Sequence, residues 1–480
     1  SVVRLYLDGV GGGDEPISEL KVGVGVPGLM ERRQLRLVCE CQGGHGADRC
    51  FHARDCAPLP SATDAEPSQP TDRSVVPCGV EERENRCVAF GSQSAGAGSE
   101  GLLSQLSLRQ KAGLLFQPPI TVRFAGDAGD RRRAELDRVA ALIEGSEIRH
   151  FNVRGSVVGA STPTAVAEYF NELQDIAERS SSGVPVTISS DPRHGFHNRP
   201  GSSIASGYLS RWPEPISFGA LDEPETVAAF ADVVRQEYRA LGIHVALHPQ
   251  ADLATDARWM RNSGTFGQDP DRVSALVAAY IRGLQGDVLG ASSVACVTKH
   301  FPGGGAQRDG EDPHFSYGKD QVYPGGFFET HLQPFAAAIA AGTSQVMPYY
   351  TRPVGTRFEE VGFAFNAEII TGILRGQLGF DGIVLSDWGI LTPGELEGQH
   401  FPALAWGVEH LTPAQRLVKA LEAGVDQFGG EWCTDLLVEL VERGEVSEER
   451  VDESAVRLLR EKQALGLFDE PRADPQRAAV

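Results

Sequence analysis

From about residue 101 onward, short apolar runs alternate with amphipathic segments of helical length, and this alternation limits the folds available to the chain. Eight of the runs have the length and β-branched content of buried strands. They span residues 114–117, 150–154, 185–191, 244–252, 294–300, 345–350, 382–387 and 424–428. Strands that alternate with helices favour parallel pairing, so we predict an α/β fold, a closed (β/α)8 TIM-type barrel. A doubly wound open sheet is the alternative.

The segments between the strands carry signals for helix starts and ends. Thr162 and Pro163 are preferred residues for an N-cap and a first helical position. Ser447 is a second predicted N-cap. Gly242 and Gly466 are predicted helix ends, because glycine readily takes the left-handed conformation found there.

Residues 1–99 differ in composition from the rest of the chain. From residue 42 to residue 100 the sequence is rich in Gly, Ala, Ser, Pro, Arg and Asp and has little apolar periodicity, so we expect a poorly structured extension. Most of the cysteines lie there, at positions 39, 41, 50, 56, 78 and 87. Their spacing, even with His45 and His52 nearby, matches no standard zinc pattern, and we expect neither a metal nor another cofactor.

Overall charge and hydrophobicity restrict the partners. The formal net charge of -21 argues against nucleic acid as the main ligand. No apolar run reaches transmembrane length, so we expect no membrane partner. No secretory signal peptide is visible, which favours a cytoplasmic over a secreted location while leaving the compartment open. The sequence also leaves the oligomeric state open.

Polar side chains gather at the C-terminal ends of the predicted strands. These ends carry Asp191, Asp252, Lys299, His300, Tyr349, Tyr350, Asp387 and Asp426. In a parallel barrel the C-terminal ends of the strands form the face that holds active sites. Polar groups that converge on one rim predict a site for a polar ligand.

One strand end is especially informative. The predicted buried strand 383–385 is followed at once by Ser386, Asp387 and Trp388. A buried carboxylate without a partner is costly, so some function or partner must account for it. We interpret Asp387 as a catalytic nucleophile and Trp388 as a wall of a sugar site. The alternative is an Asp that caps the following loop.

Several motifs together carry a resemblance to a known family. DPRHG (191–195), KHFPGGG (299–305), MPYY (347–350) and LSDWG (385–389) occur in this order on successive strand ends. RWMR (258–261), TFGQDP (265–270) and GLFD (466–469) extend the set, with Met260 and Gln268 departing from the family pattern. This set resembles the N-terminal barrel of glycoside hydrolase family 3, the β-glucosidases and their relatives. The resemblance covers residues 100–470 and leaves 471–480 as a C-terminal tail or linker.

The resemblance implies an exo-acting retaining β-glycosidase with a carbohydrate substrate and Asp387 as its nucleophile. It further implies that the terminal sugar is held by Asp191, Arg261, Lys299, His300, Tyr349 or Tyr350, and Trp388. Chemistry supports this, because such side chains can clamp vicinal hydroxyls. Lys299 could instead form an ion pair with Asp387 or Asp191. Tyr349 and Tyr350 lie on alternate faces of a strand, so only one would point into the site.

The acid/base is the open question, because a retaining glycosidase needs a second group roughly 5 Å from the nucleophile. In most two-domain family members this group is a Glu on a C-terminal α/β sandwich, and a missing sandwich domain is one explanation here. The single-domain β-N-acetylglucosaminidase branch uses an Asp-x-His pair, which Asp312 and His314 match, although Gly304 replaces a His of that branch. The alternatives are therefore a β-N-acetylglucosaminidase that uses this dyad, or a non-catalytic carbohydrate-binding barrel. Glu431 is a further carboxylate near the rim.

Overall fold

The computed structural model describes residues 95–122, 128–154, 162–197, 209–396 and 399–479, all within one compact unit, Cys87–Val480. The expectations for the extension up to residue 94, including its six cysteines, lie outside the described residues. The described chain begins with helix α1 (Ala95–Leu103), which packs against α11 (Glu448–Ala464). Within the described ranges, no helix has both the length and the hydrophobicity needed to cross a membrane.

Parallel strands form the centre of this unit. Seven pair side by side in one sheet, with every neighbouring pair parallel. In sheet order they are β10 (Ile383–Val384), β8 (Gln345–Pro348), β6 (Ala295–Phe301), β5 (Val245–Ala246), β4 (Thr187–Ser190), β3 (His150–Arg154) and β2 (Pro119–Thr121). A second parallel pair joins β13 (Phe428–Gly429) to β1 (Phe116–Gln117).

Two junctions close these strands into a ring. On one side, Leu385 and Gln427 form a parallel bridge, and the Ser386 N–H donates to the Gln427 carbonyl at 2.8 Å. On the other side, β1 and β2 are one strand interrupted at Pro118, whose carbonyl accepts from the Asn152 N–H at 3.0 Å. Each predicted strand corresponds to one strand of this ring. The predicted closed barrel is therefore confirmed, and the open sheet is excluded.

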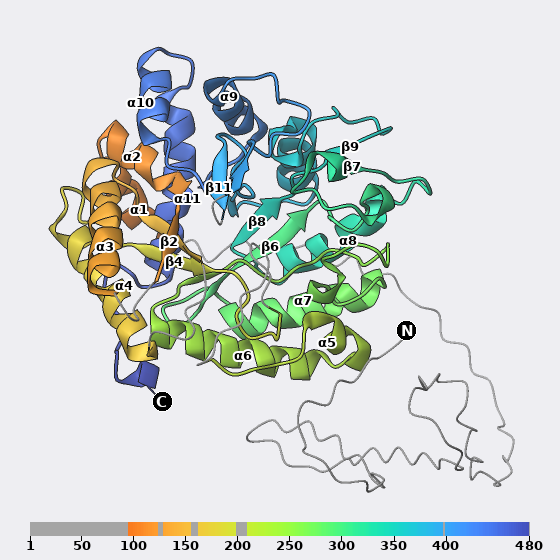
Figure 1. Cartoon of the computed structure of the whole chain (residues 1–480), viewed down its shortest axis with the longest axis horizontal. Coiled ribbons are helices and arrows are strands. Elements are labelled where there is room, and N and C mark those ends of the chain that lie inside the picture. Colours follow the sequence, from red (N-terminus) through yellow and green to blue (C-terminus); the bar gives the residue numbers. More distant parts are fainter. Residues whose placement is uncertain (1–94, 123–127, 155–161, 198–208, 397–398, 480) are drawn as a thin grey trace, which may run out of the picture. The chain divides into compact units, whose positions relative to one another are not determined.

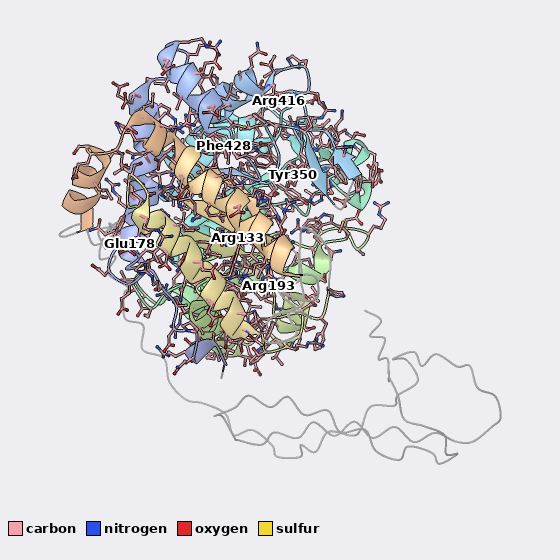
Figure 2. All side chains as sticks on the ribbon, turned by 60° about the vertical axis from the view of Figure 1, so that its left-hand side comes forward. Arg133, Glu178, Arg193, Tyr350, Arg416 and Phe428 are labelled. Carbon is pink, nitrogen blue, oxygen red and sulfur yellow. The ribbon has the colours of Figure 1, made fainter. Side chains whose placement is uncertain are left out.

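Helices surround the ring. Those that follow its strands are α3 (Ala128–Gly145), α4 (Pro163–Arg179), α6 (Pro224–Leu241), α7 (Pro270–Gln285), α8 (Phe328–Ala340), the π-helix η5 (Glu368–Gln377), α9 (Pro413–Ala423), α10 (Thr434–Glu442) and α11. Figure 1 shows α6 and α7 side by side, and Figure 2 shows the same for α3 and α4. Smaller elements are α2 (Leu108–Leu114), α5 (Pro215–Leu221), η1 (Asn262–Gly264), η2 (Arg308–Gly310), η3 (Ser316–Gly318), β7 (Asp320–Gln321), β9 (Arg352–Pro353), η4 (Phe363–Phe365), β11 (Gly394–Leu396), β12 (Gln399–Phe401) and η6 (Arg477–Ala479).

The predicted helix signals are confirmed. The Thr162 hydroxyl accepts from the Ala165 N–H at 3.2 Å and caps α4, with Pro163 in its first turn. Ser447 caps α11 by accepting from the Arg450 N–H at 3.2 Å. Gly242 ends α6 with a positive φ of 85°, a conformation that costs glycine little.

The inside of the barrel is filled by a small apolar cluster that includes Val297, Met347, Leu385, Leu465 and Leu467, with Trp388 packed against it. Successive side chains of a strand point to opposite faces, so residues two positions further along share a face. Lys299 lies two residues beyond Val297 on β6, and Tyr349 and Asp387 follow the ends of β8 and β10, just after Met347 and Leu385. The filled interior thus ends in a polar layer at the C-terminal rim.

The predicted position of one rim residue, Asp426, was wrong. The last strand starts at Phe428 rather than near residue 424, so Asp426 precedes it and lies at the N-terminal end of the barrel. There Asp426 is fully buried and accepts from the Val384 N–H at 2.9 Å and from Arg375 at 2.6 Å. Arg457 donates to it at 3.0 Å, so this carboxylate belongs to an internal ion cluster.

Candidate active site

Asp387 follows β10 closely, and its carboxylate is buried. Its Oδ1 accepts from the Trp388 N–H at 2.9 Å. Its Oδ2 is buried and has no hydrogen-bond partner among the described residues. Buried polar atoms in native proteins are nearly always satisfied, so an unpaired carboxylate oxygen at this position is a candidate for contact with a ligand.

The ring of Trp388 lies against the backbone of two glycines. A Cβ added at Gly429 would sit 2.7 Å from the indole ring, and one at Gly430 would sit 2.8 Å from it. Only glycine leaves room for the ring in this orientation. The indole Nε1 is buried without a described partner, while the Trp388 N–H also donates to the Tyr350 hydroxyl at 3.0 Å. Trp388 therefore presents a fixed aromatic surface next to Asp387.

Lys299 and Asp191 form a buried ion pair, with Lys299 Nζ 3.0 Å from Asp191 Oδ1. Of the two ion-pair partners considered from the sequence, Asp191 is the one that Lys299 contacts. Such a pair does not exclude ligand binding, because an ammonium group has three donors and a carboxylate accepts more than one hydrogen bond.

Arg261 is buried, and its guanidinium makes no hydrogen bond or ion pair with any residue in the described part of the chain. Burial lowers the pKa of this group, but nearby acidic groups more than compensate and raise it above its usual value. These neighbours are Tyr349, Asp387, Asp252 and Asp191. Arg261 thus brings an unused set of donors to the centre of the predicted sugar clamp.

His300 is fixed by a carboxylate behind it. Its Nδ1 lies 2.7 Å from Asp252 Oδ2, and its N–H donates to Asp252 Oδ1 at 3.1 Å. Burial lowers the pKa of His300 well below its usual value and raises the pKa of Asp252 to about 6. The ring of Tyr349 packs on His300 with centroids 4.3 Å apart, and its buried hydroxyl has no described partner.

Both tyrosines contribute to the site, because β8 ends at Pro348 and strand alternation stops before them. Tyr349 covers His300, whereas Tyr350 contacts the Trp388 backbone through its hydroxyl. Burial, the charge of Asp387 and a hydrogen bond to its carboxylate raise the pKa of Tyr350 well above its usual value. Tyr350, labelled in Figure 2, also packs edge-on against His314, with centroids 5.1 Å apart.

Asp312 and His314 form the dyad that the sequence suggested. His314 Nδ1 lies 2.6 Å from Asp312 Oδ1, which also accepts from the His314 N–H at 3.0 Å. Burial tends to raise the pKa of Asp312, but the hydrogen bond and positive charge of His314 outweigh burial, and the pKa lies below its usual value. Between them, the Pro313 carbonyl accepts from the buried Trp406 Nε1 at 2.8 Å. The dyad is therefore held in place and lies beside Tyr350.

Arg154 is a site residue that the sequence analysis missed. It ends β3 and feels the negative charges of Asp191 and Asp387, although burial lowers its pKa overall. It has no hydrogen bond or ion pair with a described side chain. Its position at the C-terminal end of a predicted strand was the signal that could have identified it.

Glu431, the further carboxylate predicted near the rim, binds the loop of Leu391 and Thr392. Its Oε1 accepts from the N–H groups of Leu391 and Thr392 at 2.8 and 3.0 Å, and its Oε2 accepts from the Thr392 hydroxyl at 2.6 Å. The carboxylate is buried and saturated with donors. It holds the loop that follows Asp387.

A pocket adjoins the clamp and shares Lys299 and Arg261 with it. His194 and His197, which also line it, are paired with Glu237 at 2.8 Å and Glu214 at 2.9 Å. The clamp can therefore act on a neutral polar ligand through a lysine, two arginines and several acceptors. The carboxylate of Asp387 adjoins this clamp, and the His314 ring of the dyad packs against Tyr350, which contacts the Trp388 backbone.

Comparisons with known proteins agree with this geometry. The profile of the Glycosyl hydrolase family 3 N terminal domain matches residues 130–461. The chain is 48% identical over 379 residues to the probable beta-glucosidase C of Aspergillus flavus, covering 79% of this chain and 59% of that protein. It is 41% identical to a periplasmic beta-glucosidase/beta-xylosidase of Dickeya chrysanthemi, covering 77% of this chain and 58% of that protein.

Solved structures show the same fold. A beta-glucosidase from Listeria innocua in complex with glucose superposes with a TM-score of 0.62 at 25% identity, covering 78% of this chain and 48% of that one. A family 3 beta-N-acetylglucosaminidase from Paenibacillus superposes with a TM-score of 0.61 at 28% identity, covering 75% and 63%. The chain spans about three fifths of the length of the curated relatives described above.

Proposed function

Because the chain belongs to glycosyl hydrolase family 3, we propose that it is an exo-acting retaining β-glycosidase of the β-glucosidase type, which removes terminal non-reducing β-linked sugars. The observation that carries this proposal is the buried, half-unpaired carboxylate of Asp387, which follows a barrel strand next to Trp388 and near enough to raise the pKa of Arg261. An apolar ring face, a nucleophilic carboxylate and unsatisfied donors are what a bound pyranose requires.

In the proposed reaction, Asp387 Oδ2 attacks the anomeric carbon while the bond to the leaving oxygen breaks. The product of this step is a glycosyl ester of Asp387 and a released alcohol, which takes up one proton. Water then attacks the same carbon, the ester bond breaks, and the proton lost by the water returns to the acid/base. Arg261 and Arg154 both feel the charge of Asp387, so they place positive charge close to the carboxylate that makes the attack.

The clamp would orient the sugar for this attack. Lys299 and Asp191 can together donate to and accept from adjacent hydroxyls. His300 is held by Asp252 with its other ring nitrogen available, and burial favours its neutral form. A neutral, fixed imidazole suits a hydroxyl better than a mobile cation, because it costs no reorganisation when the sugar binds.

We assign the proton transfer to His314. Its Nδ1 is engaged by Asp312, which leaves Nε2 to donate a proton to the leaving oxygen and later to accept one from water. Support comes from the contact between His314 and Tyr350, whose hydroxyl touches the backbone next to Asp387.

The dyad by itself would also fit a β-N-acetylglucosaminidase, and one contact argues against that alternative. Gly304 occupies the position where the sequence resemblance places a His of that branch. A Cβ at Gly304 would lie 2.7 Å from the Tyr349 ring and 3.1 Å from Asp252 Oδ1. A histidine would not fit there without displacing Tyr349, so the glucosidase-type assignment is favoured.

The deciding experiment uses nitrophenyl β-glycosides of glucose, xylose and N-acetylglucosamine. We expect the fastest turnover with the glucoside or xyloside, and we expect a 2-fluoro glucoside to label Asp387, as mapped by peptide mass spectrometry. Labelling of another carboxylate would refute the nucleophile. Sugar binding without any turnover would instead identify a non-catalytic carbohydrate-binding barrel.

A further inference from the structure

Three aromatic residues form an exposed cluster directly beside the dyad, and we call Phe315, Tyr317 and Phe401 the aromatic shelf. The rings of Phe315 and Tyr317 stack with centroids 5.3 Å apart and planes only 7° from parallel. Phe401 lies 6.3 Å from Phe315, between centroids. Phe315 is 42% exposed and Tyr317 is 60% exposed, so two stacked rings present a flat apolar surface to solvent.

The shelf connects the two loops that carry the proposed chemistry. Phe315 directly follows His314 on the loop after β6, while Phe401 belongs to β12, in the hairpin of the segment that follows Asp387. The two catalytic loops therefore meet at this cluster. A ligand bound on the shelf would contact both loops at once.

A tight turn fixes the shelf relative to the dyad. The Phe315 N–H donates to the Asp312 carbonyl at 3.2 Å, and the Gly318 N–H donates to the Phe315 carbonyl at 3.0 Å. A Cβ at Gly318 would lie 2.2 Å from the Asp312 carbonyl oxygen, so only glycine permits this close return of the chain. The same turn that orients Asp312 thus also orients the two stacked rings.

We propose that the aromatic shelf is the leaving-group subsite, which binds the aglycone through its apolar face. This proposal rests on the function proposed above. The leaving oxygen must lie within reach of the residue that protonates it, so the group attached to that oxygen extends past His314. The next residue along the chain is Phe315, and the shelf begins there.

The chemistry of the shelf defines the ligand class. The stacked rings offer a flat apolar surface at least as wide as one aromatic ring. Such a surface matches the C–H face of a second sugar residue or the ring of an aryl aglycone. A methyl aglycone is too small to cover such a face. The shelf would therefore make the protein prefer oligosaccharides and aryl glycosides over small alkyl glycosides.

The test compares the wild type with Phe315→Ala, Tyr317→Ala and the double variant on three substrates. The substrates are a β-linked glucose disaccharide, nitrophenyl β-glucoside and methyl β-glucoside. We expect KM for the disaccharide and the aryl glucoside to rise about 3- to 10-fold, the range expected for loss of an aromatic contact, with a clearly smaller change for the methyl glucoside. Phe468→Ala is the matched control, because Phe468 is 39% exposed and follows α11, at the opposite end of the barrel.

The remaining outcomes separate the explanations. Equal changes on all three substrates would overturn the subsite. The subsite would also be overturned if the shelf variants changed their elution volume on size exclusion but kept the wild-type substrate preference. That result would show that the shelf is a contact between protein molecules. Tyr317→Ala, two residues beyond Phe315, guards against damage to the dyad, and an unshifted alkaline limb in its pH profile would show that His314 is intact. A wild type that hydrolyses none of the three substrates would refute the proposed function instead.

Discussion

Asp426 and Asp387 are buried at opposite ends of the barrel and differ in how their carboxylates are paired. At the N-terminal end, Lys462 Nζ donates to the carbonyls of Arg149 and Pro185 at 3.0 Å each and to the Thr187 hydroxyl at 2.6 Å. Glu461 accepts from Gln345 at 2.8 Å, and Asp426 is saturated by arginines and a backbone N–H. Almost every hydrogen-bonding position of these three groups is used.

At the C-terminal end, by contrast, buried polar atoms lack described partners. They include Asp387 Oδ2, Arg261 Nε, Tyr349 Oη and Trp388 Nε1. An unsatisfied buried group costs stability, so these atoms make sense where a ligand will satisfy them. Some atoms at the N-terminal end, such as Gln345 Oε1 and Arg457 Nε, also lack described partners. The contrast is therefore one between two carboxylates: the saturated Asp426 supports the fold, whereas the half-unpaired Asp387 is reserved for substrate.

The sharpest test of this contrast is Asp387→Ala. We expect turnover of nitrophenyl β-glucoside to fall about 10⁴- to 10⁶-fold, because the covalent step is lost. The melting temperature should stay unchanged or rise, since the substitution removes a buried carboxylate with an unpaired oxygen. Initial rates and a thermal melt on the same preparation check both. A strongly destabilised variant would mean that Asp387 supports the fold, as the N-terminal charges do.

His314→Ala tests the proton transfer at the same end. Departure of an alkoxide needs protonation, whereas a nitrophenolate leaves without it, so we expect about a 10²- to 10⁴-fold loss on methyl β-glucoside and a much smaller loss on the nitrophenyl glucoside. The alkaline limb of the pH profile on methyl β-glucoside should disappear with the imidazole, because only a protonated imidazole can donate to the leaving oxygen. Equal small losses on both substrates would remove the dyad from the mechanism.

Asp426→Asn tests the N-terminal end. Removing this charge leaves Arg375 and Arg457 without their buried partner, and breaking such a cluster costs about 3–5 kcal/mol of unfolding free energy. We expect a lower denaturant midpoint with kcat of the folded protein nearly unchanged. Asp435→Asn is the control, because that carboxylate forms an exposed pair with Arg109 and should change stability by less than about 1 kcal/mol.

The error over Asp426 shows which features a sequence can predict. Strand number, parallel order and the polar rim followed from periodicity, because alternation of strands and helices is a property of local sequence. Strand boundaries did not, since a shift of a few residues decides whether a side chain faces the site or the opposite end. That shift placed Asp426 at the wrong end, and Arg154 was overlooked although its strand was correctly bounded.

The tertiary contacts within the site could not be predicted from the sequence either. Nothing in the order of residues indicates that Asp252 supports His300, or that two glycines accommodate the ring of Trp388. These contacts join strands and loops that are far apart in the chain. They depend on the register and curvature of the closed barrel, which periodicity does not specify.

Trp406→Phe gives the smallest and most discriminating test, because Trp406 acts only through another residue. Its Nε1 donates to the Pro313 carbonyl at 2.8 Å, between the two members of the dyad. Phenylalanine keeps most of the apolar volume and removes only this donor, so a buried carbonyl loses its partner at a cost of about 1–3 kcal/mol. If the bond served stability alone, the melting temperature would fall and all glycosides would be hydrolysed as before. If it positions His314, as we expect, kcat on methyl β-glucoside falls several-fold more than kcat on nitrophenyl β-glucoside, because only the first depends on proton donation. An unchanged ratio of the two kcat values would show that the C-terminal end, like the N-terminal end, contains bonds whose sole purpose is the fold.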